Sequence, residues 1–574
     1  MSVCIDGKDI EFTAGETVLA AAQRSGISIP HLCSLDWACK SEAACRMCLV
    51  EIEGAPRLQT SCTLEAKDGM KVKTRTARVQ AVRRNLVELL IANHPNDCLV
   101  CARNQNCELS QVASELGVRE RRYRGLKKNH PIDISSPSLV RDPNKCILCG
   151  RCVAVCHTVQ GVGAIDFIER GFKTRVGPGF HDGINVSSCI YCGQCTRVCP
   201  TAALMEKSQV DEVIAALSDP NAVVVAQVAP AVPATLMEKA KASSVKTMLN
   251  RLAAALKRVG FGAVFDTGFA ADLTIMEEVS ELARRVQTGG VLPMFTSCSP
   301  GWIHYVETQR PELIPHLSTC KSPQQMAAAL IKETYPKHRD LKGKRLVCVS
   351  LMPCTAKKFE ANELGDVDFV LTTREIEQLM LRFGIDLAKV TEQGTLDAPF
   401  SSATGAGRLF GGTGGVMEAA IRTAHKMLTG QELKGGLKVE EARGLEGLKC
   451  FSLDVGGTTL NFGIVNGLGR LKPMLDPIRK GTSNLHFIEV MTCPGGCIGG
   501  GGQPYDTDPE AIRIRLERIY EADKRSPLRV SHENDEVQAL YTEMLGKPLG
   551  EVSHHLLHRS YVDRTCKEAP PAVR

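Results

Sequence analysis

Residues 146–156 read CILCGRCVAVC, and residues 189–199 repeat the same cysteine spacing as CIYCGQCTRVC, followed by Pro200. Both runs follow the pattern C-x2-C-x2-C-x3-C, which is a spacing of iron–sulfur ligands. A C-x2-C pair alone also suits zinc, but eight cysteines in two matching runs favour clusters over paired zinc sites. This repeat therefore predicts a unit that holds two 4Fe–4S clusters.

The spacing is that of two-cluster bacterial ferredoxins, in which the fourth cysteine of each run binds the cluster of the other run. On this pattern the ligands of one 4Fe–4S cluster are Cys146, Cys149, Cys152 and Cys199. The ligands of the second cluster are Cys189, Cys192, Cys195 and Cys156. We expect a bacterial ferredoxin-like domain with these two clusters over residues 126–208.

N-terminal to the repeat, residues 1–80 combine alternating apolar residues with a short helix that ends at Gly26. This mixture predicts a small β-grasp domain of the 2Fe–2S ferredoxin type. Its expected 2Fe–2S ligands are Cys33, Cys45, Cys48 and Cys62. The gap before the CRMC pair is longer than in plant-type ferredoxins, so Cys39 competes with Cys33 for the outer position.

A second small domain is expected over residues 81–125, which begin with a helical pattern and contain HPNDCLVCARNQNC. Cys98, Cys101 and Cys107 provide three thiolates for a 4Fe–4S cluster, and His94 is the expected fourth ligand. A neutral imidazole binds iron and should raise the potential of such a cluster. A lone histidine is more often structural, but the three cysteines directly downstream favour the ligand interpretation.

The composition of the chain predicts an iron–sulfur protein of the cytoplasm. Its 574 residues include 25 cysteines, which in a long chain of intracellular type indicate metal binding rather than disulfides. We find no apolar run of about 18 residues that would predict a membrane span. The N-terminus is acidic where a signal peptide would be basic and then apolar.

The net charge of +6 reflects two local basic stretches, at 71–85 and 118–130. These predict solvated faces or, alternatively, a docking surface for an acidic electron-transfer protein. Nucleic-acid binding is not expected, because no recognition motif accompanies the charge.

Residues 209–574 have a different sequence pattern from the cysteine-rich segments before them. Long helical patterns alternate with apolar strands such as 222–230 and 345–354. This predicts an α/β domain with a conventional core. FGGTGG at 410–415 lacks the lysine of a phosphate-binding loop, and LDVGGTTL at 453–460 is typical of a strand and turn. The segments left as active-site candidates are FTSCSPGW (295–302), LMPCTAKKFE (351–360) and FIEVMTCPGGCIGGGGQP (487–504).

These three segments closely resemble the signature segments of the FeFe hydrogenases, usually TSCCPxW, MPCxxKxxE and ExMxCxxGCxxGGGQP. The N-terminal cysteine patterns also match the four accessory clusters of the large monomeric clostridial-type enzymes, so the resemblance covers essentially the whole chain and favours Cys33 over Cys39. It implies an H-cluster, in which a cysteine-bound 4Fe–4S cluster shares a thiolate with a two-iron unit carrying CO, cyanide and azadithiolate. The implied fold is an α+β multidomain protein whose hydrogenase domain spans 209–574.

The resemblance also assigns roles to single positions. Cys354, Cys493 and Cys497 match three ligands of the 4Fe–4S part, and Cys497 matches the bridging thiolate. Lys357 matches the lysine that faces a cyanide ligand, where a cation beside an anion is favourable. Other positions that match cofactor contacts are Ala229, Pro230, Gln324, Met352, Phe410 and Met491.

The proton relay of the family maps onto Cys298, Glu278, Ser318, Glu281 and Arg285. Glu278 and Glu281 lie three residues apart in a helical stretch, and Arg285 follows Glu281 at i+4. Read without the resemblance, this is an ordinary ion pair on a helix surface. With the resemblance, the carboxylates become general acid–base groups that serve Cys298.

The first signature departs from the family pattern at one position. The family has two adjacent cysteines, a proton donor and then a cluster ligand; here Cys298 takes the first place and Ser299 the second. A serine oxygen is a harder and more basic ligand than a thiolate. Ser299 could ligate as an alkoxide, or Cys298 could become the ligand and leave the proton step to water or Ser299. In a third interpretation the site is impaired, naturally or by engineering.

These features predict a ferredoxin-dependent FeFe hydrogenase that catalyses 2H⁺ + 2e⁻ ⇌ H2. Electrons would pass from ferredoxin or flavodoxin through one 2Fe–2S and three accessory 4Fe–4S clusters to the H-cluster. We expect a monomer that depends on hydrogenase maturation proteins and has no membrane or nucleic-acid partner.

Two other classes of protein share parts of these patterns. A respiratory NADH-dehydrogenase subunit would share the N-terminal patterns but lack CPGGCIGGGGQP. A sensory or iron–sulfur-assembly protein related to hydrogenases is favoured by Ser299 and opposed by Lys357, Met491 and the complete third segment. The histidines of SHHLLHRSY (553–561) fit no complete metal pattern, and Cys320 receives no role.

Overall fold

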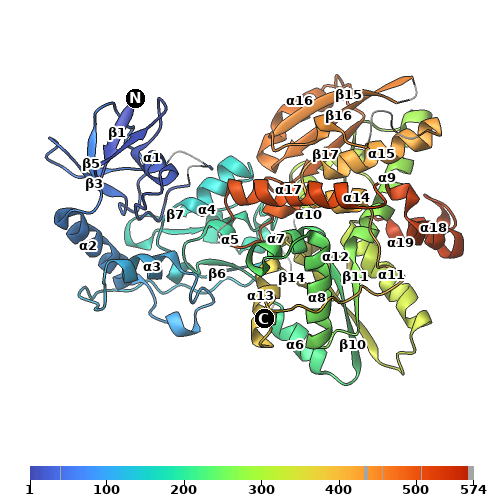
Figure 1. Cartoon of the computed structure of the whole chain (residues 1–574), viewed down its shortest axis with the longest axis horizontal. Helices are drawn as coiled ribbons and strands as arrows, with labels where there is room; N and C mark the ends of the chain where they lie inside the picture. Colours follow the sequence, from blue (N-terminus) through green and yellow to red (C-terminus); the bar gives the residue numbers. More distant parts are fainter. Residues whose placement is uncertain are drawn as a thin grey trace.

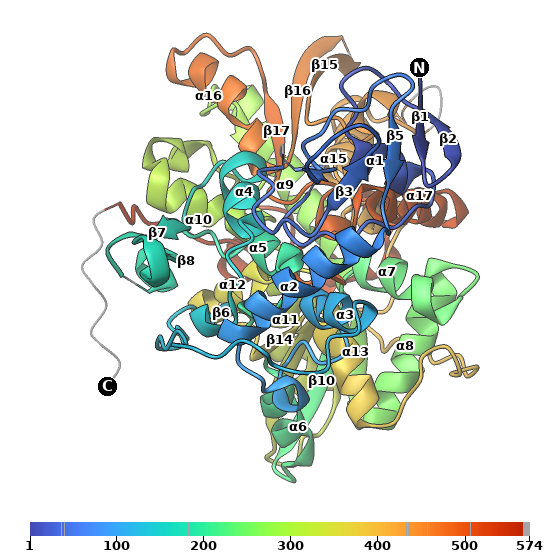
Figure 2. The ribbon, with the colours of Figure 1, turned by 90° about the vertical axis from the view of Figure 1, so that its left-hand side faces the viewer.

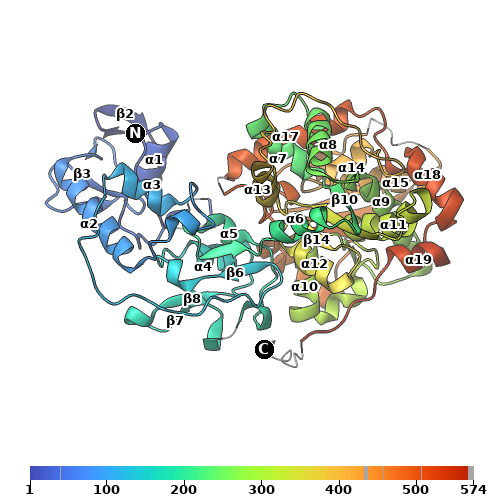
Figure 3. The same ribbon diagram turned by 90° about the horizontal axis from the view of Figure 1, so that it is seen from below.

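The computed structural model describes residues 1–565 apart from 36, 39–40, 182, 432, 434–436, 456 and 506. Cys39, the alternative 2Fe–2S ligand, lies outside the described residues. The two N-terminal domains, in blue, lie at one end of the molecule, and the large C-terminal domain, green to red, fills the other (Figures 1 and 3). The cysteine repeat lies between them, so the domain order along the chain is also the order in space.

The first unit has the β-grasp arrangement that the sequence predicts. Its five-stranded sheet has the order β2-β1-β5-β3-β4, with β1 antiparallel to β2 and parallel to β5. The strands are β1 (Ser2–Ile5), β2 (Lys8–Glu11), β3 (Leu49–Ile52), β4 (Gln59–Thr60) and β5 (Lys71–Lys73). Helix α1 (Val18–Arg24) begins where the Thr17 hydroxyl accepts a hydrogen bond from the backbone N–H of Ala20, which caps the helix.

Helices α2 (Ala77–Asn93) and α3 (Glu108–Glu115) follow, and Figure 2 shows them below this sheet. Val87 of α2 and Leu109 of α3 pack in one apolar cluster with Leu32 and Met47 from the preceding cysteine-bearing loop. The histidine-containing segment is therefore packed directly against the predicted 2Fe–2S loop.

The cysteine repeat forms a compact unit with two short helices related by the repeat. Helices α4 (Arg151–Ala154) and α5 (Gln194–Val198) each start after a glycine in the left-handed region, Gly150 at φ 78° and Gly193 at φ 70°. A left-handed residue costs little only for glycine. The strands of this unit form two antiparallel pairs, β6 (Leu139–Arg141) with β9 (Leu204–Glu206) and β7 (Asp166–Ile168) with β8 (Arg175–Gly177).

The C-terminal domain contains two four-stranded sheets. The first is wholly parallel in the order β11-β10-β13-β14, and in the second, β12-β17-β16-β15, only β15 is antiparallel to its neighbour. The first comprises β10 (Ala222–Val228), β11 (Ala263–Asp266), β13 (Arg345–Leu351) and β14 (Phe369–Leu371). The second comprises β12 (Met294–Phe295), β15 (Leu448–Val455), β16 (Thr458–Asn466) and β17 (Phe487–Met491).

Helix α9 (Thr267–Thr288) joins the cores of the two sheets. Phe269 and Leu273 belong to the core around the first sheet, whereas Ile275 and Val279 belong to the core around the second. A helix with apolar residues on opposite faces is buried between neighbours rather than amphipathic. This placement takes the polar residues of α9 into the interior.

The remaining helices cover the sheets. They are α6 (Val210–Ser218), α7 (Ala231–Ala240), α8 (Val245–Val259), α10 (Pro300–Gln309), α11 (Pro323–His338), α12 (Ala356–Leu364), α13 (Thr373–Arg382), α14 (Gly405–Leu409), α15 (Gly415–Thr429), α16 (Lys472–Arg479), α17 (Pro509–Arg525), α18 (Asp535–Leu540) and α19 (Glu551–Leu557). None of the described helices is both long and apolar enough to cross a membrane.

Four parallel strands from the two sheets end at the loops that carry the sequence motifs. Strand β10 runs into Ala229, β12 into the loop with Cys298, β13 into the loop with Cys354, and β17 into the loop with Cys493. Loops at the carboxyl ends of parallel strands are the usual location of binding sites in α/β domains. The fold thus gathers the three signature segments at one place.

Candidate active site

Cys354, Cys493 and Cys497 line one cavity at the carboxyl ends of β13 and β17. Cys298 and Lys357 line the same cavity. Its wall also contains the other positions predicted to contact the cofactor, Ala229, Pro230, Ser299, Gln324, Met352, Phe410 and Met491. The structure therefore brings these predicted positions together, although they come from segments far apart in the sequence.

The chemistry of this cavity fits a cysteine-bound cluster. Burial raises the pKa of Cys493 and Cys497 to about 12, and the nearby Cys354 thiol adds to this effect on both. Grouped thiols in an apolar wall hold their protons, whereas a bound metal cluster stabilises them as thiolates. The three donors match the ligand set expected for the 4Fe–4S part of an H-cluster.

Two glycines of the third segment are required by close backbone packing beside Cys497. A Cβ atom at Gly500 would lie 2.3 Å from the carbonyl oxygen of Pro353, in the loop that carries Cys354. One at Gly496, which has φ 85°, would lie 2.7 Å from the backbone nitrogen of Thr413. Glycine at these positions allows the loop of Cys497 to approach the loop of Cys354 on one side and the segment around Thr413 on the other.

Lys357 reaches the cavity with a buried counterion. Its Nζ lies 2.9 Å from Oε2 of Glu360 and donates a hydrogen bond to the carbonyl oxygen of Cys298 at 3.2 Å. Glu360 in turn accepts hydrogen bonds from Ser322 and Gln324. The second signature contains Glu360, but the sequence alone gave it no role; the structure shows that it orients the lysine and balances its charge.

Cys298 and Ser299 lie next to each other in the cavity wall but have different surroundings. Burial raises the pKa of Cys298 well above its usual range, so its sulfur carries a proton. The Ser299 hydroxyl is 2.7 Å from the Thr492 hydroxyl, and either oxygen can be the donor. Thr492 also lines the cavity, and the sequence analysis did not identify it.

Glu278 is buried behind Cys298. Its Oε1 accepts a hydrogen bond from the backbone N–H of Ser297 at 3.3 Å, and its Oε2 has no hydrogen-bond partner within the described part of the chain. Burial, to which the charge of Glu281 adds, raises the pKa of Glu278 to about 8. A carboxyl group with this pKa exchanges protons near neutral pH.

Glu281 is also buried, at 1% exposure, so the interpretation of these carboxylates as a helix-surface ion pair is wrong. Its Oε2 accepts a hydrogen bond from the Ser318 hydroxyl at 3.0 Å, and its Oε1 lies 2.6 Å from Arg285. The Ser318 hydroxyl also contributes to the pKa of Glu278, which it lowers. Cys298, Glu278, Ser318, Glu281 and Arg285 thus follow one another from the cavity to a half-buried arginine.

The eight cysteines of the repeat line two further cavities, grouped as the interlocked pattern predicts. One is lined by Cys146, Cys149, Cys152 and Cys199, and the other by Cys156, Cys189, Cys192 and Cys195. Each cavity thus takes three cysteines from one run and the fourth from the other. This arrangement suits two 4Fe–4S clusters.

The second of these cavities adjoins the active-site cavity, a relationship that the sequence analysis did not predict. Cys192 lines both. From the same run, Gln194 and Arg197 donate hydrogen bonds to the carbonyl oxygen of Gly499, at 2.9 and 2.6 Å. The repeat is therefore fastened to the glycine-rich loop of the third segment.

The N-terminal ligand candidates are also grouped. Cys48 and Cys62 have their sulfur atoms 3.2 Å apart, and the sulfur of Cys33 accepts a hydrogen bond from the backbone N–H of Cys45 at 3.5 Å. These two pairs include all four predicted 2Fe–2S ligands and place Cys33 in the group.

His94 has the geometry of a metal ligand. Its Nδ1 lies 2.7 Å from the carbonyl oxygen of Pro95, so this nitrogen carries the proton and Nε2 presents a lone pair. That Nε2 is buried and without a hydrogen-bond partner among the described residues. Burial lowers the pKa of His94, which keeps the ring neutral as ligation requires.

Family models match the chain in consecutive segments. The iron only hydrogenase large subunit, C-terminal domain, matches residues 222–501, and the iron hydrogenase small subunit matches 509–564. N-terminal to them, a 2Fe-2S iron-sulfur cluster binding domain matches 1–77, the NADH-ubiquinone oxidoreductase-G iron-sulfur binding region matches 83–122, and a 4Fe-4S dicluster domain matches 145–203.

Individual proteins resemble the chain over most or all of its length. It is 44% identical to NADP-reducing hydrogenase subunit HndD of Solidesulfovibrio fructosivorans, covering 98% of this chain and 99% of that protein. It is 36% identical to iron hydrogenase 1 of Clostridium pasteurianum, with the same coverage. A solved structure of a variant of the apo FeFe-hydrogenase HydA1 from Chlamydomonas reinhardtii superimposes with a TM-score of 0.54 at 39% identity, covering 62% of this chain and 99% of that one.

Full-length relatives named as hydrogenases favour the predicted hydrogenase over the two other classes. The chain belongs to the FeFe hydrogenase family.

Proposed function

We propose that this chain interconverts protons, electrons and H2 at an H-cluster held by Cys354, Cys493 and Cys497. The observation that carries the proposal is the shared cavity in which these thiols meet Cys298 and Lys357. When bound, the H-cluster supplies the iron centre at which electrons and protons combine. Lys357, balanced by Glu360, places a cation beside the anionic ligands expected there.

The protein's own residues hold and move the protons. The protonated Cys298 thiol faces the cavity and can donate its proton there. Glu278, with a pKa of about 8, is protonated at neutral pH and restores the thiol proton. The Ser318 hydroxyl and Glu281 continue the route, and Arg285 holds the Glu281 carboxylate in place at its outer end.

Ser299 supplies the fourth ligand of the 4Fe–4S part in this proposal. The Thr492 hydroxyl, 2.7 Å from the Ser299 oxygen, supports it, because a hydrogen bond donated from Thr492 would stabilise a serine oxygen that has lost its proton. Cys298 then stays free for proton transfer. The alternative in which Cys298 is the ligand requires the thiol to leave the position next to Glu278.

Electrons reach the active site through four accessory clusters, one 2Fe–2S and three 4Fe–4S. The ligand sets are those predicted from the sequence, and the shared wall at Cys192 supports the last step. Ferredoxin or flavodoxin remains the predicted donor. The name of the relative HndD, an NADP-reducing hydrogenase subunit, favours a nicotinamide-linked partner subunit as the second candidate.

We also propose the domain limits 1–80, 81–125, 126–208 and 209–574. The limits after residues 125 and 208 fall between elements, whereas the limit after residue 80 falls within α2. The predicted cytoplasmic location, the monomeric state and the need for maturation proteins stay predictions.

The test is a gas assay on protein produced together with hydrogenase maturation proteins. With reduced methyl viologen, the proposal expects H2 evolution. A variant with Cys497→Ala should contain its accessory clusters, seen by iron content, and evolve no H2. Absence of activity in a wild-type protein with the full two-iron complement would contradict the proposal.

A further inference from the structure

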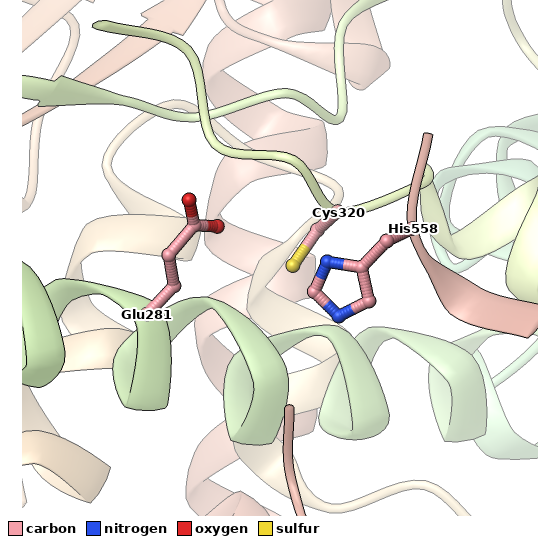
Figure 4. A group of neighbouring side chains, drawn as sticks. All are labelled: Glu281, Cys320 and His558. Carbon is pink, nitrogen blue, oxygen red and sulfur yellow. The ribbon is translucent and has the colours of Figure 1, made fainter. Parts of the chain in front are cut away.

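Glu281, Cys320 and His558 bring three metal-ligand atoms together beside the candidate proton relay. A carboxylate oxygen, the thiol sulfur and a ring nitrogen all lie within 4.8 Å of one another, and all three residues are buried. They come from helix α9, the loop before α11 and the segment that follows α19 (Figure 4). A β-bridge between Cys320 and His558 holds the last two segments together.

His558 is oriented as metal-binding histidines usually are. Its Nε2 lies 3.2 Å from Oε2 of Glu277, and because a carboxylate only accepts, this nitrogen carries the proton. Glu277 is itself fixed by hydrogen bonds from the Tyr541 hydroxyl at 2.6 Å and the Leu549 backbone N–H at 2.7 Å. The lone pair of Nδ1 is on the side of Cys320 (Figure 4), where it accepts a hydrogen bond from the Thr319 hydroxyl. A carboxylate behind the histidine fixes its tautomer and strengthens it as a ligand.

The Thr319 hydroxyl lies at the centre of this group. It donates its single proton to Nδ1 of His558, 2.8 Å away, and its oxygen also lies 3.3 Å from Oε2 of Glu281. The Thr319 residue is only half-buried, and rotation about one single bond removes the hydroxyl from this position. When the hydroxyl moves away, the volume that it occupies can hold an ion or a water molecule.

We propose that Glu281, Cys320 and His558 form a binding site for a zinc ion. Zinc takes cysteine, histidine and carboxylate ligands in a tetrahedral set, and the fourth place is open to water or to the Thr319 hydroxyl. A thiolate with an imidazole disfavours magnesium and calcium, which prefer oxygen ligands. On binding, Cys320 releases its S–H proton to solvent and forms the zinc–sulfur bond, while His558 binds as the neutral ring.

Zinc at this site would remove Glu281 from proton transfer. The carboxylate oxygen that accepts from Ser318 is the one nearest to the histidine-bound hydroxyl, so a metal bond there replaces that contact. Bound zinc therefore inhibits the enzyme. This consequence rests on the proposed function, whereas the binding of zinc does not.

The site is tested on the holoenzyme, whose cluster cysteines are occupied by iron. Zinc chloride is added in small excess, free metal is removed by gel filtration, and zinc and iron are measured by mass spectrometry. Wild type should retain one zinc per chain with its iron content unchanged. Crystals soaked in zinc should show an anomalous peak between the three side chains.

The variants Cys320→Ala and His558→Gln should retain no zinc at this site. The matched controls are Cys348→Ala, which changes another fully buried cysteine, and His554→Gln, which changes the exposed ring stacked on His558. Both controls should bind zinc as wild type does. If Cys320→Ala fails to fold, His558→Gln decides the same question.

Two results would overturn the site: no zinc retained by wild type, or equal zinc in wild type and in the two ligand variants. The activity assay is a separate readout. Saturating zinc should lower H2 evolution by wild type about a hundredfold or more, since proton-transfer groups contribute on that scale. Each ligand variant should evolve H2 at the same rate with zinc as without it. Bound zinc with undiminished activity would keep the site and overturn the role of Glu281 in the relay.

Discussion

The Lys357 ammonium, which lines the active-site cavity, lies 2.9 Å from the Glu360 carboxylate behind it, and both residues are less than 10% exposed. A cation in so buried a place depends on its partner, because removal of one member leaves an uncompensated charge.

Glu360→Gln should therefore destabilise the protein, by about 3 kcal/mol, and lower activity as Lys357 loses its orientation. Thermal melting and the viologen assay measure the two effects. The control is Glu363→Gln, whose partner Arg564 is partly exposed, and it should change little. A melting temperature equal to that of wild type in Glu360→Gln would contradict the role given to this pair.

Glu278→Gln should lower H2 evolution about a hundredfold or more, because an amide cannot carry a proton between Cys298 and Ser318. In wild type, H2 evolution should fall as the pH rises through about 8, where the Glu278 carboxyl loses its proton. This limb of the pH profile should be absent in the variant. Glu333→Gln, on an exposed helix position, should retain both the rate and the limb. An unchanged limb in Glu278→Gln would assign it to another group.

The same carboxyl group gives a stability prediction with a definite sign. Its pKa rises from 4.5 to about 8 on folding, so the unfolded chain ionises first as the pH increases. The stability that this group contributes is fully present below pH 4.5 and is lost by about pH 8. Between pH 5 and pH 8 the melting temperature of wild type should therefore fall more than that of Glu278→Gln. The variant should be more stable relative to wild type at pH 8 than at pH 5.

Ser299→Cys restores the two adjacent cysteines of the family pattern. If Ser299 is the fourth ligand, this variant and wild type should both contain a complete 4Fe–4S part, with different reduction potentials in an EPR-monitored titration. Cys298→Ala should then retain the cluster and lose activity. Loss of the cluster in Cys298→Ala would instead identify Cys298 as the ligand.

His94→Cys replaces a neutral ligand by a charged thiolate. The variant should retain its cluster, and the potential of that cluster should fall by on the order of 100 mV, since histidine ligation raises potentials of iron–sulfur centres. His338→Gln, at an exposed position, is the control. A cluster of unchanged potential would show that His94 does not ligate iron.

Gly501→Ala tests the contact between the cysteine repeat and the active-site loop. A Cβ atom there would lie 2.1 Å from the carbonyl oxygen of Cys192, so the two loops must separate. Overpacking of this kind costs about 1–3 kcal/mol, and we expect slower electron delivery with clusters still present. Gly125→Ala, where a Cβ atom meets nothing within 4 Å, should behave as wild type.

The structure groups the cysteines of the repeat as their spacing predicts, because the geometry of such runs is local. The two runs of the repeat each place three thiols on one short loop, and the exchange of Cys156 and Cys199 between cavities follows from the same pattern. The β-grasp unit and the alternation of helices and strands in the C-terminal domain were likewise predictable from short-range periodicity.

Contacts between distant segments were not predictable in this way. Without the family resemblance, Glu278 and Glu281 read as surface residues, because their polarity says nothing about a helix buried between two sheets. Glu360 was present in the second signature, but only the fold shows that it pairs with Lys357. The histidines at 553–561 fit no metal spacing because the partners of His558 come from α9 and from the loop before α11.

A single residue, Cys192, lines both the second cavity of the repeat and the active-site cavity. Charges in adjoining cavities interact through protein of low dielectric, where Coulomb energies are large. An electron that resides in one cavity therefore makes it harder for another to enter its neighbour. With the proposed clusters bound in both cavities, the two centres would titrate as an anticooperative pair with shared macroscopic potentials, and the chain would store electrons singly rather than fill both centres together.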